Sequence, residues 1–224
     1  MTSAAIDNPE QGDNEKRKLI GIVIFNNFET LDVFGPVQMW GRLSGHRVVF
    51  ISPDGRPAHS AQGAVIEASY SFEDAPQSDV LMIPGGMGTR KLVNDPATLA
   101  FVRMQHQHTS WTTSVCTGAA ILARAGVLDG RRATTNKVAF DWVASQSAKV
   151  QWLGRARWVV DGKLITSSGV SAGTDMALSL VTNLYGRGAA EEVAAVAEYV
   201  WNDDPYNDPF AIKPNITAEA DITL

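Results

Sequence analysis

Apolar runs of strand length alternate with helix-like segments along most of the chain. The runs at 19–25 and 80–84 are almost entirely apolar, which is typical of parallel strands covered on both faces. Helical segments are predicted at 32–41, 95–108 and 117–125, where small or amphipathic stretches end at turn signals. Because strands and helices alternate, the chain predicts an α/β fold with a mostly parallel sheet and helices on both faces.

Shorter elements complete this prediction. Further strands are expected at 47–52, 65–70, 111–115 and 133–135, further helices at 136–145, 173–185 and 189–199, and a hairpin of 158–160 with 164–166. The hairpin prediction depends on Asp161-Gly162, a dipeptide that favours two-residue turns. The polar segment 1–18 is expected to be a disordered arm, and 19–224 to form one domain with an irregular tail after Trp201, draped over the body or across a partner.

Composition limits the classes of partner. The 224 residues are 45% hydrophobic and 19% charged, an ordinary balance for a globular protein, and the formal net charge is -5. This acidic balance argues against nucleic acid as a partner, and no apolar run approaches the roughly 20 residues of a membrane helix. A single cysteine excludes an internal disulfide and favours a reducing, cytoplasmic location.

That cysteine stands at a sharp change of pattern. The β-rich stretch 111–115 ends at Cys116, and the small residues 117–120 follow. Such a strand-to-helix corner exposes its residue at the carboxyl end of the sheet, as the Gly-x-Ser-x-Gly elbow of α/β hydrolases does. Backbone amides at the start of a helix favour a thiolate over a thiol. Cys116 is therefore predicted to be a nucleophile at an elbow, with a small buried hydrophobe as the alternative.

Asp32 is the candidate acid. Its apolar neighbours Leu31, Val33 and Phe34 predict a partly buried carboxyl after the first strand. Two negative charges side by side repel each other, so Asp32 and the cysteine are expected to share one proton, as a neutral acid beside a thiolate. Capping of the helix is the alternative role for Asp32, and Glu29 is a rival acid that is expected to be more exposed.

Other groups are expected at the same edge of the sheet, because ligands of open α/β sheets bind outside the carboxyl ends of the strands. Gly85 and Gly86 end a buried strand and are predicted to bring backbone amides close to a substrate, although a tight turn alone is the alternative. Thr117 has its hydroxyl and amide next to the sulfur, where it either contacts the reacting atoms or only starts the helix.

Histidine and metal-ligand patterns do not accompany the cysteine. All four histidines (46, 59, 106 and 108) precede Cys116 in the sequence. A cysteine amidase or protease needs a histidine to deprotonate the thiol and to protonate the leaving amine, so these classes are disfavoured. No spaced cluster of metal ligands and no Gly-x-Gly-x-x-Gly after the first strand occurs, so neither a metal nor a dinucleotide cofactor is expected.

These motifs together resemble the ThiJ/PfpI superfamily, whose members are flavodoxin-like. The resemblance covers about 19–210. Its landmarks are Leu31-Asp32-Val33-Phe34-Gly35-Pro36, Ile83-Pro84-Gly85-Gly86, Ser114-Val115-Cys116-Thr117-Gly118, Arg132-Ala133-Thr134-Thr135 and Ser168-Gly169-Val170-Ser171-Ala172-Gly173-Thr174-Asp175. Within the superfamily, the aspartate, the Cys-Thr-Gly elbow and the Ala-Thr-Thr strand are most similar to isocyanide hydratases. Asn136 departs from the pattern, because many relatives have a histidine there.

The resemblance implies roles for individual residues. Cys116 would be the nucleophile, Asp32 the general acid and base, Thr117 a polar contact, and Val170 part of a segment that lines the pocket. The implied reaction is the hydration of an isocyanide to an N-substituted formamide through a covalent thioimidate, without a cofactor, in a homodimer. Such a reaction expels no amine in its first step, so it tolerates the lack of a histidine.

Three alternatives remain open at the level of sequence. One is a redox or electrophile sensor that uses the same thiol without turnover. Another is a glyoxalase-type or deglycase activity on α-oxoaldehydes. The third is a ligand-binding module of a regulator. The physiological substrate also stays open.

Overall fold

A central sheet organises the protein, whose computed structural model describes residues 17–211. The sheet has seven strands in the order β10-β11-β7-β6-β1-β2-β5. They are β1 (Lys18–Val23), β2 (His46–Ser52), β5 (Tyr70–Ser71), β6 (Val80–Ile83), β7 (Trp111–Ser114), β10 (Trp158–Asp161) and β11 (Leu164–Ser167). Neighbouring strands run parallel except β10, which pairs antiparallel with β11 as the predicted hairpin. The predicted disordered arm at 1–18 lies almost wholly outside the described residues.

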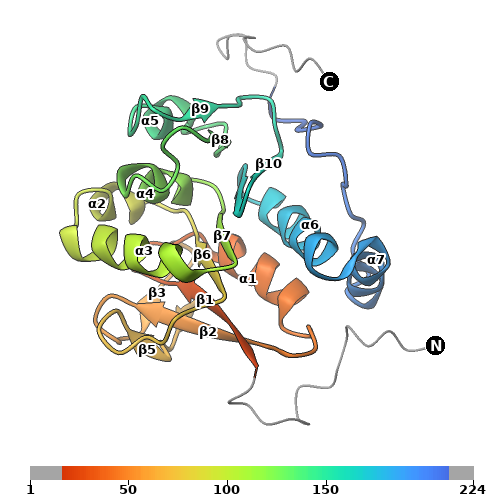
Figure 1. Ribbon diagram of the computed structural model, residues 1–224, viewed down its shortest axis with the longest axis horizontal. Helices are drawn as coiled ribbons and strands as arrows, with labels where there is room; N and C mark the ends of the chain where they lie inside the picture. The colour runs from red at the N-terminus through yellow and green to blue at the C-terminus, as the bar shows by residue number, and fades with distance from the viewer. Residues whose placement is uncertain (1–16, 212–224) are drawn as a thin grey trace.

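Helices cover both faces of this sheet (Figure 1). They are α1 (Thr30–Trp40), α2 (Thr89–Leu92), α3 (Pro96–His108), α4 (Gly118–Arg124), α5 (Phe140–Ala144), α6 (Ala172–Tyr185) and α7 (Arg187–Val196). On one face α1 packs against α6 and α6 against α7, whereas α3 and α4 pack together on the other. The predicted α/β architecture, with a flavodoxin-like sheet between two layers of helices, is therefore confirmed.

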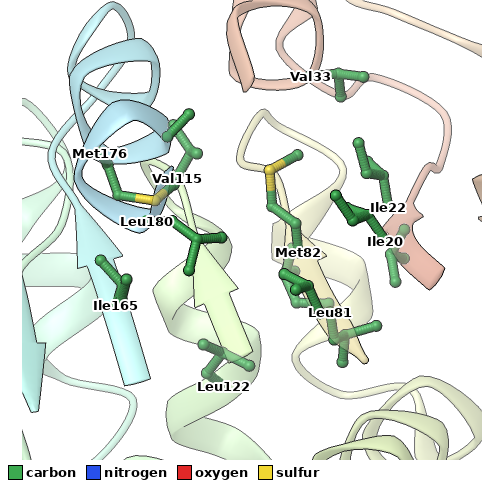
Figure 2. Close-up of a cluster of buried hydrophobic side chains, with 14 of the residues drawn as sticks. Ile20, Ile22, Val33, Leu81, Met82, Val115, Leu122, Ile165, Met176 and Leu180 are labelled. Atoms are coloured by element: carbon green, nitrogen blue, oxygen red, sulfur yellow. The ribbon is translucent and has the colours of Figure 1, made fainter. Parts of the chain in front are cut away.

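The core lies between the sheet and the two layers of helices. After Lys18, every residue of β1 is buried, as expected for a central parallel strand. Figure 2 shows the apolar side chains that fill the space, among them Ile22 of β1, Met82 of β6, Leu122 of α4 and Met176 of α6. Burial of such side chains removes apolar surface from water and is the main favourable term in folding.

Two predicted elements differ from the structure. The strand expected at 65–70 is split, because β4 (Val65–Ile66) pairs with β3 (Ala58–His59), whereas β5 joins the edge of the central sheet beside β2. The helix expected at 136–145 begins only at Phe140. Asn136 accepts a hydrogen bond from the backbone N–H of Ala139 (2.9 Å), a local turn that competes with helix formation.

Outside the central sheet, β8 (Arg132–Ala133) pairs with β9 (Gln151–Trp152). After α7 the described chain continues without helix or strand to residue 211, as the predicted irregular tail does. Pro205 of this segment accepts a hydrogen bond from the backbone N–H of Arg157 (2.7 Å), so residues 201–211 lie on the body of the protein. No helix in the described part of the chain is both long and apolar enough to cross a membrane.

Candidate active site

Cys116 occupies a strained corner between β7 and α4. Its φ of 55° lies in the left-handed region, which costs a residue with a side chain on the order of 1–3 kcal/mol. Hydrogen bonds fix this conformation from two sides: the backbone N–H of Cys116 donates to Ser168 O (3.2 Å), and Thr135 Oγ1 donates to Cys116 O (2.8 Å). The corner aims the thiol out of the sheet at its carboxyl edge, where the sequence predicted it.

Asp32 lies next to this corner and is completely buried. Its Oδ2 accepts a hydrogen bond from the backbone N–H of Gly85 (2.8 Å), whereas Oδ1 has no hydrogen-bond partner among the described residues. Glu29 occupies the N-cap of α1 and no side chain caps the helix, so Asp32 does not serve as a helix cap. Its carboxyl is instead directed to the loop after β6.

Burial decides the protonation of Asp32. Loss of hydration raises the pKa of the carboxyl well above its ordinary value, and the hydrogen bond from Gly85 offsets this only in part. The neutral carboxylic acid is therefore favoured to a higher pH than in an exposed aspartate. Its Oδ1, which has no hydrogen-bond partner among the described residues, is the atom from which a proton could pass to a bound molecule.

The same surroundings also shift the pKa of the Cys116 thiol. Burial and then the negative charge of Asp32 raise its pKa, whereas hydrogen bonds from the amide and hydroxyl of Thr117 lower it. When Asp32 holds its proton, the repulsion disappears and the Thr117 hydrogen bonds favour the thiolate. Two negative charges at this place are unfavourable, so the pair holds at least one proton.

Glycine is required where the two residues meet. A Cβ on Gly85 would lie 2.8 Å from Asp32 Oδ2, 2.8 Å from Cys116 Cβ and 2.6 Å from Thr117 N, all too close for a side chain. The backbone of β6 therefore approaches the nucleophile and the acid directly.

The amides of Gly85 and Gly86, which the sequence predicts to lie close to a substrate, both donate hydrogen bonds within the protein. The N–H of Gly85 binds Asp32, and the N–H of Gly86 donates to Thr117 Oγ1 (3.0 Å). Both amides are thus used to hold the acid and the threonine. A role of Gly85 and Gly86 in binding substrate stays a prediction.

A second loop closes the site from the side of β11. A Cβ on Gly169 would lie 2.9 Å from Cys116 Sγ and 2.5 Å from Asn136 Nδ2, so this backbone and the Asn136 amide both lie beside the sulfur. Val170 follows directly and is half-buried, and its place in a wall of the pocket stays a prediction. In the sequence, Asn136 stood out only as a departure from the family pattern. Gly169 was visible only as a member of the segment 168–175 that carries the resemblance.

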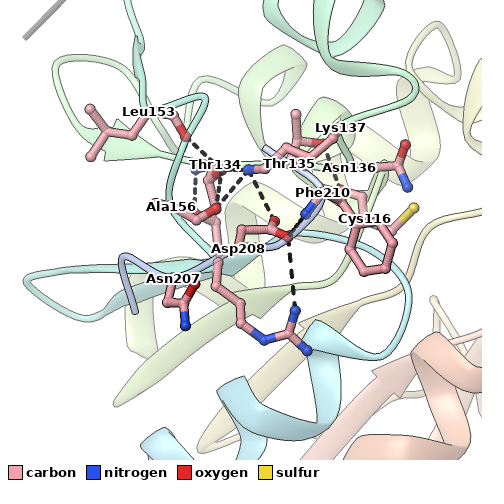
Figure 3. Close-up of polar contacts among 12 residues, drawn as sticks. Cys116, Thr134, Thr135, Asn136, Lys137, Leu153, Ala156, Asn207, Asp208 and Phe210 are labelled. Carbon is pink, nitrogen blue, oxygen red and sulfur yellow. Dashed lines mark hydrogen bonds and ion pairs between the residues drawn. The ribbon is translucent and has the colours of Figure 1, made fainter. Parts of the chain in front are cut away.

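A buried ionic network supports these loops, and the sequence gave no signal for it. Lys137 donates to Ala156 O (2.6 Å) and Thr134 Oγ1 (2.9 Å), and its Nζ lies 3.6 Å from Asp208 Oδ2 (Figure 3). Asp208 belongs to the irregular tail, and its other oxygen lies 3.9 Å from Arg157. Burial lowers the pKa of Lys137 to about 8, although Asp208 raises it. The tail thereby reaches the loop that carries Asn136.

No group of three or more His, Cys, Asp or Glu side chains within residues 17–211 is arranged to hold a metal ion. The chemistry available at the site is that of a thiol, a buried carboxyl and the hydrogen-bond donors around them. Together these residues can form a covalent bond to carbon and move one proton.

Comparison with known proteins places these features in a family. The DJ-1/PfpI family model matches residues 18–183. Isonitrile hydratase of Pseudomonas putida is 37% identical over 180 residues, which are 80% of this chain and 78% of that protein. The HTH-type transcriptional regulator GbdR of Pseudomonas aeruginosa is 30% identical over 88% of this chain, which spans only 54% of the regulator.

Solved structures agree with this relationship. The crystal structure of a ThiJ/PfpI family protein from Pseudomonas syringae superposes with a TM-score of 0.76 at 32% identity, covering 85% of this chain and 78% of that one.

Proposed function

The chain belongs to the DJ-1/PfpI family, and from this premise we propose that it hydrates isocyanides, R–N≡C, to N-substituted formamides by means of Cys116 and Asp32. The observation that carries the proposal is the fully buried Asp32 carboxyl beside Cys116, with one oxygen that has no partner within the described residues. The similarity to isonitrile hydratase, an enzyme named for the same class of substrate, supports the proposal.

In the first step, the Cys116 thiolate attacks the terminal carbon of the isocyanide. That carbon accepts the sulfur and must gain a hydrogen, which the neutral carboxyl of Asp32 supplies from Oδ1. The product is a thioimidate, R–N=CH–S, attached to the cysteine, and Asp32 is left as a carboxylate. The raised pKa of Asp32 serves this step, because it keeps the proton on the acid until the substrate takes it.

In the second step, the Asp32 carboxylate takes a proton from water, whose hydroxide adds to the thioimidate carbon. The hydroxyl proton of this adduct moves to the nitrogen as the C–S bond breaks. The formamide R–NH–CHO leaves, the sulfur leaves as thiolate, and Asp32 again holds its proton. One water is consumed and both groups return to their initial state, so one nucleophile and one acid suffice.

The geometry of the site argues against two other functions, oxidant sensing and amide hydrolysis. A sensor of oxidants requires an exposed thiol, whereas Cys116 is only 6% exposed. Amide hydrolysis would need a proton donor for a leaving amine, and no histidine belongs to the site as described above. We include in the proposal the cytoplasmic location and the homodimer that the sequence and the family resemblance suggest.

A direct assay tests the proposal. Purified protein is incubated with an alkyl or aryl isocyanide, and the formamide is quantified by chromatography, with methylglyoxal as a parallel substrate. Formamide production with little consumption of methylglyoxal is the expected result. Consumption of methylglyoxal alone would favour the glyoxalase-type alternative, and binding of an isocyanide without its consumption would favour a ligand-binding module.

A further inference from the structure

Arg90 of α2 is a cation held at the edge of the active site. Its guanidinium carbon lies 3.5 Å from the centroid of the Trp142 ring, which belongs to α5. Its Nη1 also lies 3.4 Å from Thr89 Oγ1. Stacking on an indole fixes the plane of a guanidinium and leaves the N–H groups at its edge available to a ligand.

Two threonine hydroxyls lie between Arg90 and the nucleophile. Thr89 Oγ1 donates to Thr117 Oγ1 (3.2 Å), and Thr117 is the residue that donates to the Cys116 sulfur. The negative charge of Cys116 also acts on the guanidinium, where it raises the pKa of Arg90 against the effect of burial. Arg90 is thus close enough to the sulfur to act on a molecule bound there.

Arg90 has no carboxylate partner within residues 17–211, although it is half-buried. Other arginines of this protein behave differently: Arg157 pairs with Asp175, and Arg187 with both Glu191 and Asp203. A half-buried guanidinium without a counterion attracts an anion from outside the protein.

Glu29, at the start of α1, is an anionic group that acts on the site. Its Oε1 accepts a hydrogen bond from Gln62 Nε2 (2.8 Å), which fixes it near the start of α1. Its negative charge acts on both Asp32 and Cys116. An anionic ligand is therefore repelled from the α1 side and attracted to the α2 side, where Arg90 lies.

We propose that Arg90 binds an anionic group of the substrate, so that the preferred isocyanides carry a carboxylate or a similar acid on their R group. This inference names the substrate class of the proposed reaction and rests on it. An isocyanide group is linear, so its substituent points away from the sulfur when the terminal carbon meets Cys116. The planar fork of an arginine matches a carboxylate with two parallel hydrogen bonds, which would fix the orientation of the substrate.

Alkylation of the single cysteine tests the anion site without any isocyanide. Iodoacetate and iodoacetamide are similar in size and differ in charge, and both add to Cys116, where intact-mass measurement counts the adduct. The ratio of the two rate constants cancels changes in the reactivity of the sulfur itself. We expect Arg90→Gln to lower the iodoacetate-to-iodoacetamide ratio about fivefold and Arg90→Lys to lower it less.

Lys91→Gln is the matched control, because it removes one positive charge from the neighbouring, exposed residue of the same helix. Its ratio should remain close to that of the wild type. An equal ratio in Arg90→Gln and wild type would overturn the proposed anion site, and so would an equal loss in Lys91→Gln.

Turnover separates this inference from the proposed function. Isocyanoacetate and its methyl ester are compared in the wild type and in Arg90→Gln. A wild-type preference for isocyanoacetate that falls in the variant supports the inference. Hydration of both compounds with no preference overturns the anionic substrate class and leaves the hydratase proposal intact. If neither compound is hydrated but the alkylation ratio still falls in Arg90→Gln, the hydratase proposal fails while the anion site stands.

Discussion

The backbone N–H of Gly85 donates a 2.8 Å hydrogen bond to Oδ2 of Asp32, and this contact fixes the acid against the nucleophile. It occupies one carboxyl oxygen and leaves the other without a partner among the described residues. Two segments far apart in the sequence are joined at this point, the start of α1 and the loop after β6. The chemistry proposed above depends on this contact, because it determines which oxygen holds the mobile proton.

Asp32→Asn keeps the shape of the side chain but removes the exchangeable proton. We expect kcat/KM for an isocyanide to fall roughly 10²-fold or more, the range that general acid–base groups supply. Steady-state assays with the purified variant measure this, and circular dichroism verifies that it is folded. An unchanged kcat/KM would show that another group moves the proton.

The same residue predicts how stability depends on pH. Burial raises the pKa of Asp32 in the folded state, so as pH rises the unfolded chain loses this proton first. The contribution of Asp32 to stability is complete below its unfolded pKa and is lost as pH rises towards its folded pKa. Asp32→Asn lacks this effect, so its stability relative to the wild type should increase as pH rises from about 4 towards the folded pKa of Asp32.

Urea unfolding of both proteins at several pH values measures the difference. The slope expected in this window is up to about 1.4 kcal/mol per pH unit. A difference that stays constant, or that shrinks as pH rises, would mean that Asp32 is ionised in the folded protein.

Gly85→Ala tests the close approach of β6 to the site. The added methyl would lie 2.6–2.8 Å from the Thr117 amide, Asp32 Oδ2 and Cys116 Cβ, so these groups must move apart. We expect a loss of at least about 10²-fold in kcat/KM, because displacements of about 1 Å are costly in positioned sites. Gly188→Ala in α7 is the control: nothing lies within 4 Å of its new Cβ, and activity should be unchanged. Equal activity of the two variants would contradict the described geometry.

Asp208 is predicted to stabilise the fold through its buried ion pairs. Its side chain is fully buried beside Lys137 and Arg157, and Asp208→Asn would leave these cations with less compensation. We expect a loss of about 3 kcal/mol in the free energy of unfolding. Asp203→Asn removes a carboxylate from an exposed pair with Arg187 and should cost much less, because solvent screens exposed ion pairs. Chemical denaturation compares the two, and similar losses would mean that the buried pairs contribute little.

Much of the fold and part of the site could be predicted from local sequence. The elbow at Cys116 is visible as a strand that changes abruptly into small residues, and Asp32 as an acid among apolar neighbours. The start of α3 is also visible in the sequence, because Asp95 is a favoured capping residue directly before Pro96, and its Oδ2 accepts a hydrogen bond from Thr98 N (2.8 Å). In each case the physical cause lies within a few residues along the chain.

The remaining features depend on contacts between distant segments. The stack of Arg90 on Trp142 and the pairing of Lys137 with Asp208 require the folded arrangement of helices and tail. The glycine pair after β6 indicated a close approach of backbone, but not that its amides bind Asp32 and Thr117. Sequence patterns indicate where a functional polar group lies in the chain. The residue that it pairs with is determined by the folded arrangement of distant segments.

The most direct measurement is intact-mass analysis of the protein during turnover of an isocyanide, with Cys116→Ala in parallel. A thiolate nucleophile predicts a transient adduct on Cys116 equal to the mass of the whole isocyanide, steady release of formamide, and neither event in the variant. Formamide production by Cys116→Ala at the wild-type rate would contradict covalent catalysis by this residue.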